Sequence, residues 1–294
     1  MTQDQLAYRQ ELAGHMREIA AMNESDWILP GYEEIDRKRL ALRRQANRLE
    51  LCGLQYAITV CGQCHQPLLG PQRCECRICD SCAKKYASRV WHRMTNLAKT
   101  LQPKDGKQLM LLTLTKKTHP LYWPTSSEAR LLFRQARKLI NKVYPKRDGC
   151  GAFAVMEVGC NHNLHIHALV YGRFVYQKEI SALWLKLTGD SDVVHIEAAR
   201  NPKKGVSYLL KYITKPKKDA DAKELARYLN LLIGIRRIHT YGVFYNYSLL
   251  KKAGTPCPLC NGRLRLRGFD PGPNVPVNAL FFEEALKIAK ASVN

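Results

Sequence analysis

Apolar and polar positions in the middle of the chain recur at periods that predict an ordered series of strands and helices. Short apolar runs predict strands at 107–115, 151–158, 164–171 and about 192–199. Helical periodicity predicts helices at 127–144, with Ser126 or Ser127 as the cap, at about 177–187 and at about 204–215. The resulting β-α-β-β-α-β-α order predicts an α+β fold, in which an antiparallel sheet has helices packed on one face, as in ferredoxin-like or RNA-recognition-type folds.

The regions on either side of this pattern have a different texture. We expect residues 1–51 to form a basic helical segment, which either contacts DNA or is a solvated helix packed on the main domain. Residues 52–100 are predicted to form a cysteine-rich module with a connecting helix, and 101–250 the main domain. Residues 251–294 are predicted to hold a cysteine knuckle, a Pro/Gly-rich linker and a last short helix.

The predicted helix at about 204–215 repeats Tyr-x-x-Lys in tandem. At about 100° per residue, Tyr208, Lys211, Tyr212 and Lys215 share one stripe, and apolar residues occupy the opposite one. We therefore expect the tyrosines to face away from the core. A phenol is a weak nucleophile at neutral pH, and an adjacent ammonium favours the phenolate. The repeat predicts two sequential attacks; the alternative is a basic helix face that is solvated or contacts phosphates.

Two histidines lie on one predicted strand, at a spacing that puts both rings on the same face. His165 and His167 can ligate one cation there, and Glu157 on the preceding strand can come alongside them. Two nitrogens and one oxygen suit Mn²⁺ or Mg²⁺ in phosphate chemistry. The alternative is a pair of histidines that only satisfy polar groups of the sheet. His162 and His195 are less certain candidates.

Composition points to a polyanionic partner. The 294 residues include 47 Lys and Arg against 25 Asp and Glu, a net charge of +22 that is spread along the chain. Nucleic acid is the partner that this balance favours. The chain shows neither an export signal nor an apolar run of about 20 residues, so we expect a cytoplasmic protein that does not enter a membrane.

Most of the 11 cysteines sit in C-x-x-C pairs, which indicate bound metal rather than disulfides. Cys61 and Cys64 with Cys79 and Cys82 have nearly the spacing of a four-thiolate Zn²⁺ site. The second pair can also be Cys76 with Cys79, and Cys257 and Cys260 need two further ligands, such as Cys74 and Cys76. One or two structural Zn²⁺ ions are therefore expected. These modules would present a basic set to DNA, namely Lys84, Lys85, Arg89 and Arg93, while Cys52, Cys150 and Cys160 are expected to be buried or free thiols.

Three motifs in order, Leu112-Thr-Leu-Thr115, Glu157 with His165-Ile-His167, and Tyr208-Leu-Leu-Lys-Tyr-Ile-Thr-Lys215, resemble those of HUH-type rolling-circle replication initiators. The resemblance covers about residues 107–216. The tandem tyrosines are most similar to the gene A replication endonucleases of single-stranded DNA phages, and Helitron-type transposases share the layout. Related plasmid initiators have one tyrosine and a Glu four residues earlier. Tyr208 occupies that Glu position here.

The resemblance implies a fold with the histidines on a central strand, a bound divalent cation, and cleavage of single-stranded DNA at a replication origin. Tyr212 would attack and remain as a 5′-phosphotyrosine, and Tyr208 could attack after one round of synthesis. Lys211 and Lys215 would stabilise the negative charge. A host helicase and DNA polymerase would be needed as partners. Two alternatives remain: an HUH-type transposase, and a zinc-ribbon DNA-binding regulator without catalysis.

Overall fold

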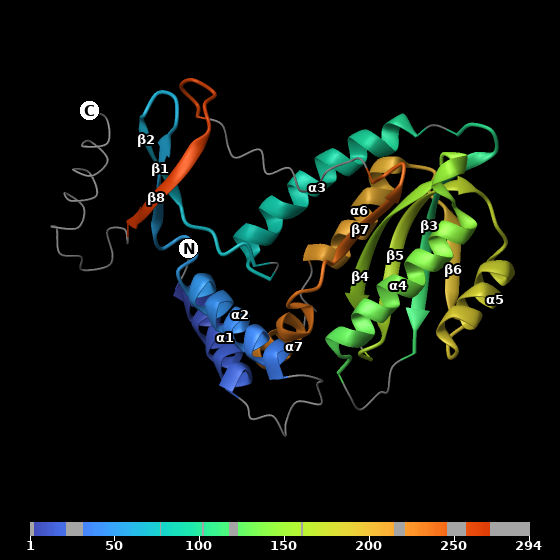
Figure 1. Ribbon diagram of the computed structural model, residues 1–294, viewed down its shortest axis with the longest axis horizontal. Helices are drawn as coiled ribbons and strands as arrows, with labels where there is room; N and C mark the ends of the chain where they lie inside the picture. Colours follow the sequence, from blue (N-terminus) through green and yellow to red (C-terminus); the bar gives the residue numbers. More distant parts are fainter. Residues whose placement is uncertain are drawn as a thin grey trace.

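A computed structural model of the chain describes residues 3–21, 32–76, 78–101, 103–117, 123–159, 161–214, 221–245 and 257–270. Its described elements form a five-stranded sheet with helices, a helical cluster that contains the N-terminal helices, and a small three-stranded sheet (Figure 1). The two sheets lie at opposite ends of the molecule, and α3 (Asp80–Thr100) runs between them (Figure 1).

The large sheet has the strand order β6-β3-β5-β4-β7, and every neighbouring pair is antiparallel. Its strands are β3 (Lys107–Lys116), β4 (Gly151–Val158), β5 (Leu164–Arg173), β6 (Val194–Ala198) and β7 (Ile238–Gly242). The sequence predicts the first four of these, with β5 central and β4 and β5 as a hairpin. The edge strand β7 is an addition, because its five residues lie in an aromatic stretch without clear alternation.

One face of this sheet is covered by α4 (Ser126–Val143) and α5 (Gln177–Thr188), as predicted. The inward residues of β3 and β5, such as Leu112 and Ile166, pack there against Leu132 and Trp184. The cap of α4 is Thr125 rather than Ser126 or Ser127. Its hydroxyl accepts from the Glu128 backbone N–H, and the Glu128 carboxylate accepts from the Thr125 backbone N–H.

Helices also cover the opposite face, which the expectation of helices on one face did not include. There α3 and α6 (Pro202–Thr214) pack on the alternate residues of the strands, including Phe153, Val155 and Leu169. The reason is that β4 and β5 are apolar on both sides, so neither face of the sheet centre is left to water. The antiparallel α+β class is confirmed.

The N-terminal helices form a second core with a helix from much later in the chain. Helices α1 (Gln3–Ala21) and α2 (Tyr32–Glu50) pack with α7 (Ala222–Leu232) and with the cysteines of 52–82. The predicted basic helical segment therefore comprises two helices with a buried side, on which Leu12, Met16 and Leu42 are fully buried.

The small sheet joins the two cysteine-rich ends of the chain. It has the order β2-β1-β8, built from β1 (Tyr56–Cys61), β2 (Pro67–Pro71) and β8 (Leu264–Asp270). Pairing of β1 with β8 brings the segment after residue 256 back to the first cysteine pair. The predicted last short helix and nearly all of the linker before it lie outside the described residues.

Candidate active site

The two histidines of β5 share one face of the sheet, on the side covered by α6. Each ring is held by a threonine from the neighbouring strand β3. Thr115 Oγ1 lies 2.9 Å from His165 Nδ1, and Thr113 Oγ1 lies 3.1 Å from His167 Nδ1. These contacts follow from the antiparallel register, which sets Thr115 opposite His165 and Thr113 opposite His167. Engaging Nδ1 in this way leaves Nε2 of each ring directed at the site.

Glu157 reaches the histidines from the other neighbouring strand. The β4–β5 register sets it opposite His165, but its Oε2 lies 2.7 Å from His167 Nε2. The His167 side chain is 7% exposed, and that of Glu157 is 33% exposed. The carboxylate thus lies at the boundary between the core and solvent, where it can turn without breaking the sheet.

The donor set fits a divalent cation in its chemistry. Burial lowers the pKa of His165, with a smaller contribution from His167, so its ring is neutral and keeps a lone pair for a metal. Gly159 leaves room beside this ring, because a Cβ there would lie 2.6 Å from His165 Nε2. The three donor atoms do not all lie within 4.8 Å of one another. Glu157 must therefore turn from His167 for one ion to be held by all three residues.

Both tyrosines of α6 lie beside these histidines. The Tyr212 ring is stacked on the His167 ring, with centroids 3.7 Å apart and planes 4° from parallel. The Tyr208 ring lies edge-on to both, 5.2 Å from Tyr212 and 6.0 Å from His167. Both are half-buried against the core that α3 and α6 form with the sheet. The expectation that they face away from the core is wrong, since α6 lies between the sheet and α3 and is covered on more than one side.

The surroundings of Tyr212 disfavour its phenolate. Burial raises the pKa of Tyr212, and a hydrogen bond with Tyr208 and the charge of Glu157 raise it further. Lys211 lies over the Tyr208 ring, with its Nζ 5.8 Å from the centroid. The predicted effect of an adjacent ammonium is therefore not met at Tyr212. Lys215 lies outside the described residues.

Arg237 supports the nucleophile helix and was not singled out in the sequence. Its Nη2 donates to the backbone carbonyl of Tyr212 at 2.7 Å, and its guanidinium lies 5.3 Å from the centroid of the Tyr228 ring. Arg237 is buried, at 9% exposure. A basic pair, Arg236-Arg237, directly before a β-branched and aromatic strand is the signal that could have found it, because alternate residues there point to opposite sides.

The first cysteine cluster combines the two ends of the chain. Cys61, Cys64, Cys257 and Cys260 bring their sulfurs within 4.8 Å of one another. Backbone N–H groups of Cys64 and Gln63 lower the pKa of the Cys61 thiol to about 6, which favours the thiolate that a metal needs. The pairing of Cys61 and Cys64 with Cys79 and Cys82 is therefore wrong, because the β1–β8 pairing brings a distant knuckle closer.

The second cluster consists of Cys52, Cys74, Cys79 and Cys82, all buried. Cys52 was expected to be a buried or free thiol, but it occupies the place predicted for Cys76. Arg9 of α1 donates to the Cys52 carbonyl at 2.7 Å and to Cys79 Sγ at 3.5 Å. Four thiolates in each cluster match the chemistry of structural Zn²⁺. Cys150 is buried outside both clusters, and Cys160 lies outside the described residues.

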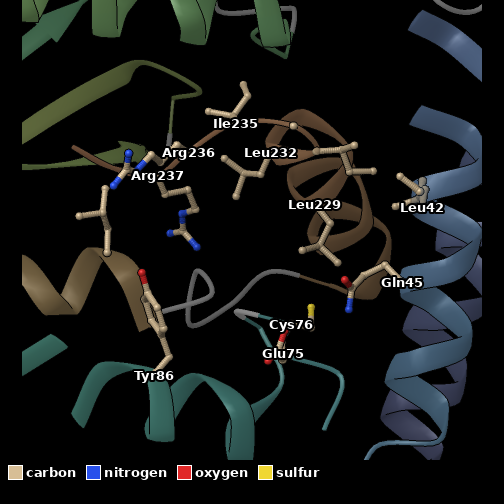
Figure 2. Close-up of a pocket in the computed structure, with 14 residues that line it drawn as sticks. Leu42, Gln45, Glu75, Cys76, Tyr86, Leu229, Leu232, Ile235, Arg236 and Arg237 are labelled. Atoms are coloured by element: carbon tan, nitrogen blue, oxygen red, sulfur yellow. The ribbon is translucent and has the colours of Figure 1, made fainter. Parts of the chain in front are cut away.

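Cys76 instead lines a cavity of about 420 Å³ between the helical cluster and the large sheet. Figure 2 shows Leu229 and Leu232 pointing into it from α7, with Leu42 on α2 to one side and Tyr86 on α3 below. Arg236 and Arg237 lie at its far wall. The catalytic candidates do not line this cavity.

The predicted DNA-binding set lies on α3. Lys84, Lys85 and Arg89 are exposed, and Arg93 is half-buried. The helix packs on α6, and Trp91 Nε1 donates to Ser207 Oγ at 2.9 Å, so the basic helix runs alongside the tyrosine helix.

The two less certain histidines lie away from the cation donors. His195 is exposed on β6, with its Nε2 3.7 Å from Glu197 Oε2. The His162 ring packs on Trp123 at a centroid distance of 4.5 Å.

Residues 109–217 match a family model of replication-associated proteins, described as the ORF2/gene 2 protein family. The matched segment contains nearly all of β3 and runs through α6, and with them both histidines, Glu157 and both tyrosines. The match supports a relation of this segment to rolling-circle replication initiators. No curated protein and no solved structure matched the chain. None of the helices that the structure describes combines the length and apolar character needed to cross a bilayer.

Proposed function

We propose that this protein is a metal-dependent endonuclease and strand transferase, which nicks single-stranded DNA at a replication origin and starts rolling-circle replication through a 5′-phosphotyrosine. One observation carries the proposal: the Tyr212 ring stacks on His167, which in turn bonds Glu157. A phenol is thus next to the donors that suit a divalent cation. The family match over the same segment supports this assignment.

In the proposed reaction, Tyr212 Oη attacks the phosphorus of the scissile phosphodiester. A bond forms between that oxygen and phosphorus, and the bond from phosphorus to the 3′-oxygen breaks. The phenol loses its proton, and the departing oxygen gains one and becomes a 3′-hydroxyl. Because burial raises the pKa of Tyr212, the phenol is protonated at neutral pH before DNA binds. Tyr208, which is hydrogen-bonded to it, is placed to receive the proton and to act as the second nucleophile.

His165, His167 and Glu157 would hold Mg²⁺ or Mn²⁺. When bound, the ion supplies positive charge that polarises the phosphate and favours the phenolate. Thr113 and Thr115 fix the two rings, and Glu157 leaves His167 to face the ion. Lys211 and Lys215 would offset charge on the phosphate, and Lys84, Lys85, Arg89 and Arg93 would bind the DNA backbone. A host helicase and polymerase would extend the freed 3′-hydroxyl.

The test is formation of a covalent adduct with single-stranded oligonucleotides from the protein's own replicon, in Mg²⁺ or Mn²⁺. Tyr212→Phe should abolish the first adduct. His165→Ala should abolish cleavage, while much of the salt-sensitive DNA binding remains. Tyr228→Phe, which removes a half-buried phenol on α7, is the matched control and should leave the adduct yield unchanged. Adduct mass should rise by the 5′-phosphorylated product strand.

Other results assign the chemistry differently. Loss only in Tyr208→Phe reverses the roles of the two tyrosines, and an unaltered adduct in the double variant removes both from the reaction. A protein that binds DNA but forms no adduct with any oligonucleotide is a DNA-binding regulator of the zinc-ribbon kind. Adducts with the ends of a mobile element, but not with an origin, indicate an HUH-type transposase.

A further inference from the structure

A basic groove of about 850 Å³ lies at the β7 edge of the large sheet, on the face covered by α4. One wall is the C-terminal half of α4 with the 3₁₀ turn η2 (Lys146–Asp148), and the other is β7 with the residues on either side of it. His165 and His167 lie on the opposite face, two strands away on β5. The groove is therefore separate from the candidate active site.

The groove concentrates positive charge without compensation. Five basic residues line it: Arg137, Lys142, Lys146, Arg147 and Arg236, all of them exposed. None of its described lining residues is acidic. Arg147 lies 3.8 Å from the Asp148 carboxylate, and in the described parts of the chain the other four make no ion pair with a carboxylate. Like charges held together raise the free energy of the groove until an anion binds.

Two of these arginines act on the same point from opposite walls. Arg137 comes from α4 and Arg236 from the residues before β7, and both affect His239 and Tyr241 of β7. Burial raises the pKa of Tyr241 to about 12, while the two arginines oppose the rise. The Tyr241 hydroxyl is buried and has no hydrogen-bond partner within the described residues. Two guanidinium groups and an unsatisfied hydroxyl thus converge where a phosphate oxygen would satisfy them.

Aromatic groups accompany the charges. Tyr245, at the end of the groove, is 67% exposed, and His239 is half-buried with its ring 3.9 Å from that of Phe133. Exposed aromatic rings between cationic side chains are typical of surfaces that bind unpaired nucleotides, because bases stack on the rings while phosphates contact the cations. An acidic peptide would use the charges but would have no use for the ring of Tyr245.

We propose that the groove between α4 and β7 binds the backbone of a DNA single strand outside the candidate active site, through Arg137 and Arg236, with Tyr245 stacking on a base. Because β7 is the sheet edge, a strand can pass around it from one face to the other. The inference rests on the proposed function only for the identity of the strand as DNA. It assigns the groove to the part of the strand that is not being cut.

The test measures binding of a long labelled oligonucleotide without added Mg²⁺ or Mn²⁺, so that cleavage does not interfere. Arg137→Gln with Arg236→Gln should weaken binding about tenfold at low salt, and should reduce the salt slope by about 1.4, because each single-strand phosphate contact contributes about 0.7. Lys178→Gln with Lys186→Gln on α5 is the matched control, which removes the same charge from exposed positions elsewhere. It should change affinity by less than about twofold. Tyr245→Ala should weaken binding of single strands about tenfold and leave duplex binding unchanged.

The outcomes separate this inference from the proposed function. A groove variant that binds the oligonucleotide like the α5 control overturns the inference. So does a variant that loses affinity for poly-glutamate but not for DNA, which would assign the groove to an acidic protein. Cleavage is measured apart, on a short oligonucleotide confined to the nick site, where groove variants should match the unmodified protein. Failure of that protein to cut the short strand contradicts the proposed function and leaves the groove measurement intact.

Discussion

At the scale of single residues, the site depends on what the neighbouring strands and turns leave free. Thr113 and Thr115 bond the Nδ1 atoms of the two histidines, so the residues of β3 choose which nitrogen each ring presents. Gly159 follows β4 and leaves the space that His165 Nε2 occupies. These contacts are as important to a metal site as the ligands themselves, because they fix the orientation of each ligand.

Gly159→Ala should disturb the cation site while preserving the fold. The added Cβ would lie 2.6 Å from His165 Nε2, a distance that forces the ring to move. We expect Mn²⁺ affinity and nicking to fall by about 10- to 100-fold, the usual effect of disturbing the support of a metal ligand. Titration calorimetry with Mn²⁺ measures the first directly.

Gly14→Ala is the matched control for that change, because a Cβ at Gly14 meets no atom within 4 Å. It should leave Mn²⁺ affinity unaltered and stabilise α1 by roughly 0.5–1 kcal/mol. Equal Mn²⁺ affinity in the two variants would contradict the assignment of His165 as a ligand.

At the scale of elements, the short segment before β7 serves both faces of the sheet. Arg236 lines the basic groove, and the next residue, Arg237, bonds the carbonyl of Tyr212 in the last turn of α6. A cation at this end of a helix offsets the partial negative charge of the unpaired carbonyls. The edge of the sheet therefore holds the C-terminal end of the tyrosine helix in place.

Arg237→Met should reduce catalysis more than binding. Loss of the hydrogen bond to Tyr212 frees the last turn of α6, while removal of a buried charge limits the cost to the free energy of unfolding to about 2 kcal/mol. In single-turnover measurements at saturating oligonucleotide, the rate of adduct formation should fall about tenfold, the lower end of the effect expected for a supporting residue.

Arg236→Met provides the comparison, since its side chain is exposed in the groove. It should weaken oligonucleotide binding and leave the saturated rate unchanged. A normal rate in Arg237→Met would show that the contact with Tyr212 does not position the nucleophile.

At the scale of the whole molecule, the cysteine clusters join segments that are far apart in sequence. One cluster ties the small sheet together through both ends of the chain, and the other lies in the helical core that α1, α2 and α7 share. Arg9 connects α1 to the second cluster. A Zn²⁺ ion in each would therefore fix the position of the N-terminal helices and of the small sheet.

Cys52→Ser and Cys76→Ser should differ in zinc content, although both residues are buried in the same core. Elemental analysis should find two Zn²⁺ ions per chain in the unmodified protein and in Cys76→Ser, but one in Cys52→Ser. Cys52→Ser should also lower the melting temperature, because metal binding contributes to folding. Loss of zinc in Cys76→Ser with retention in Cys52→Ser would restore the ligand set expected from spacing.

Much of the central domain could be predicted because its signals are local. The strands 107–115, 151–158 and 164–171 and the helices between them follow from apolar periodicity, and the shared face of His165, His167 and Glu157 follows from the period of two in paired strands. The small sheet and β7 could not, because their strands are short and their pairing partners lie far along the chain.

The sequence by itself determined the α+β class, the net charge of +22 and the residues from which a site can be built, because periodicity and composition act over a few neighbouring residues. Tertiary structure alone decided which four cysteines meet, that helices cover both faces of the sheet, and that Tyr212 stacks on His167. These are contacts between segments up to 199 residues apart, as for Cys61 and Cys260. Only strand register and the packing of all the helices together select among them, since many pairings share the same local pattern.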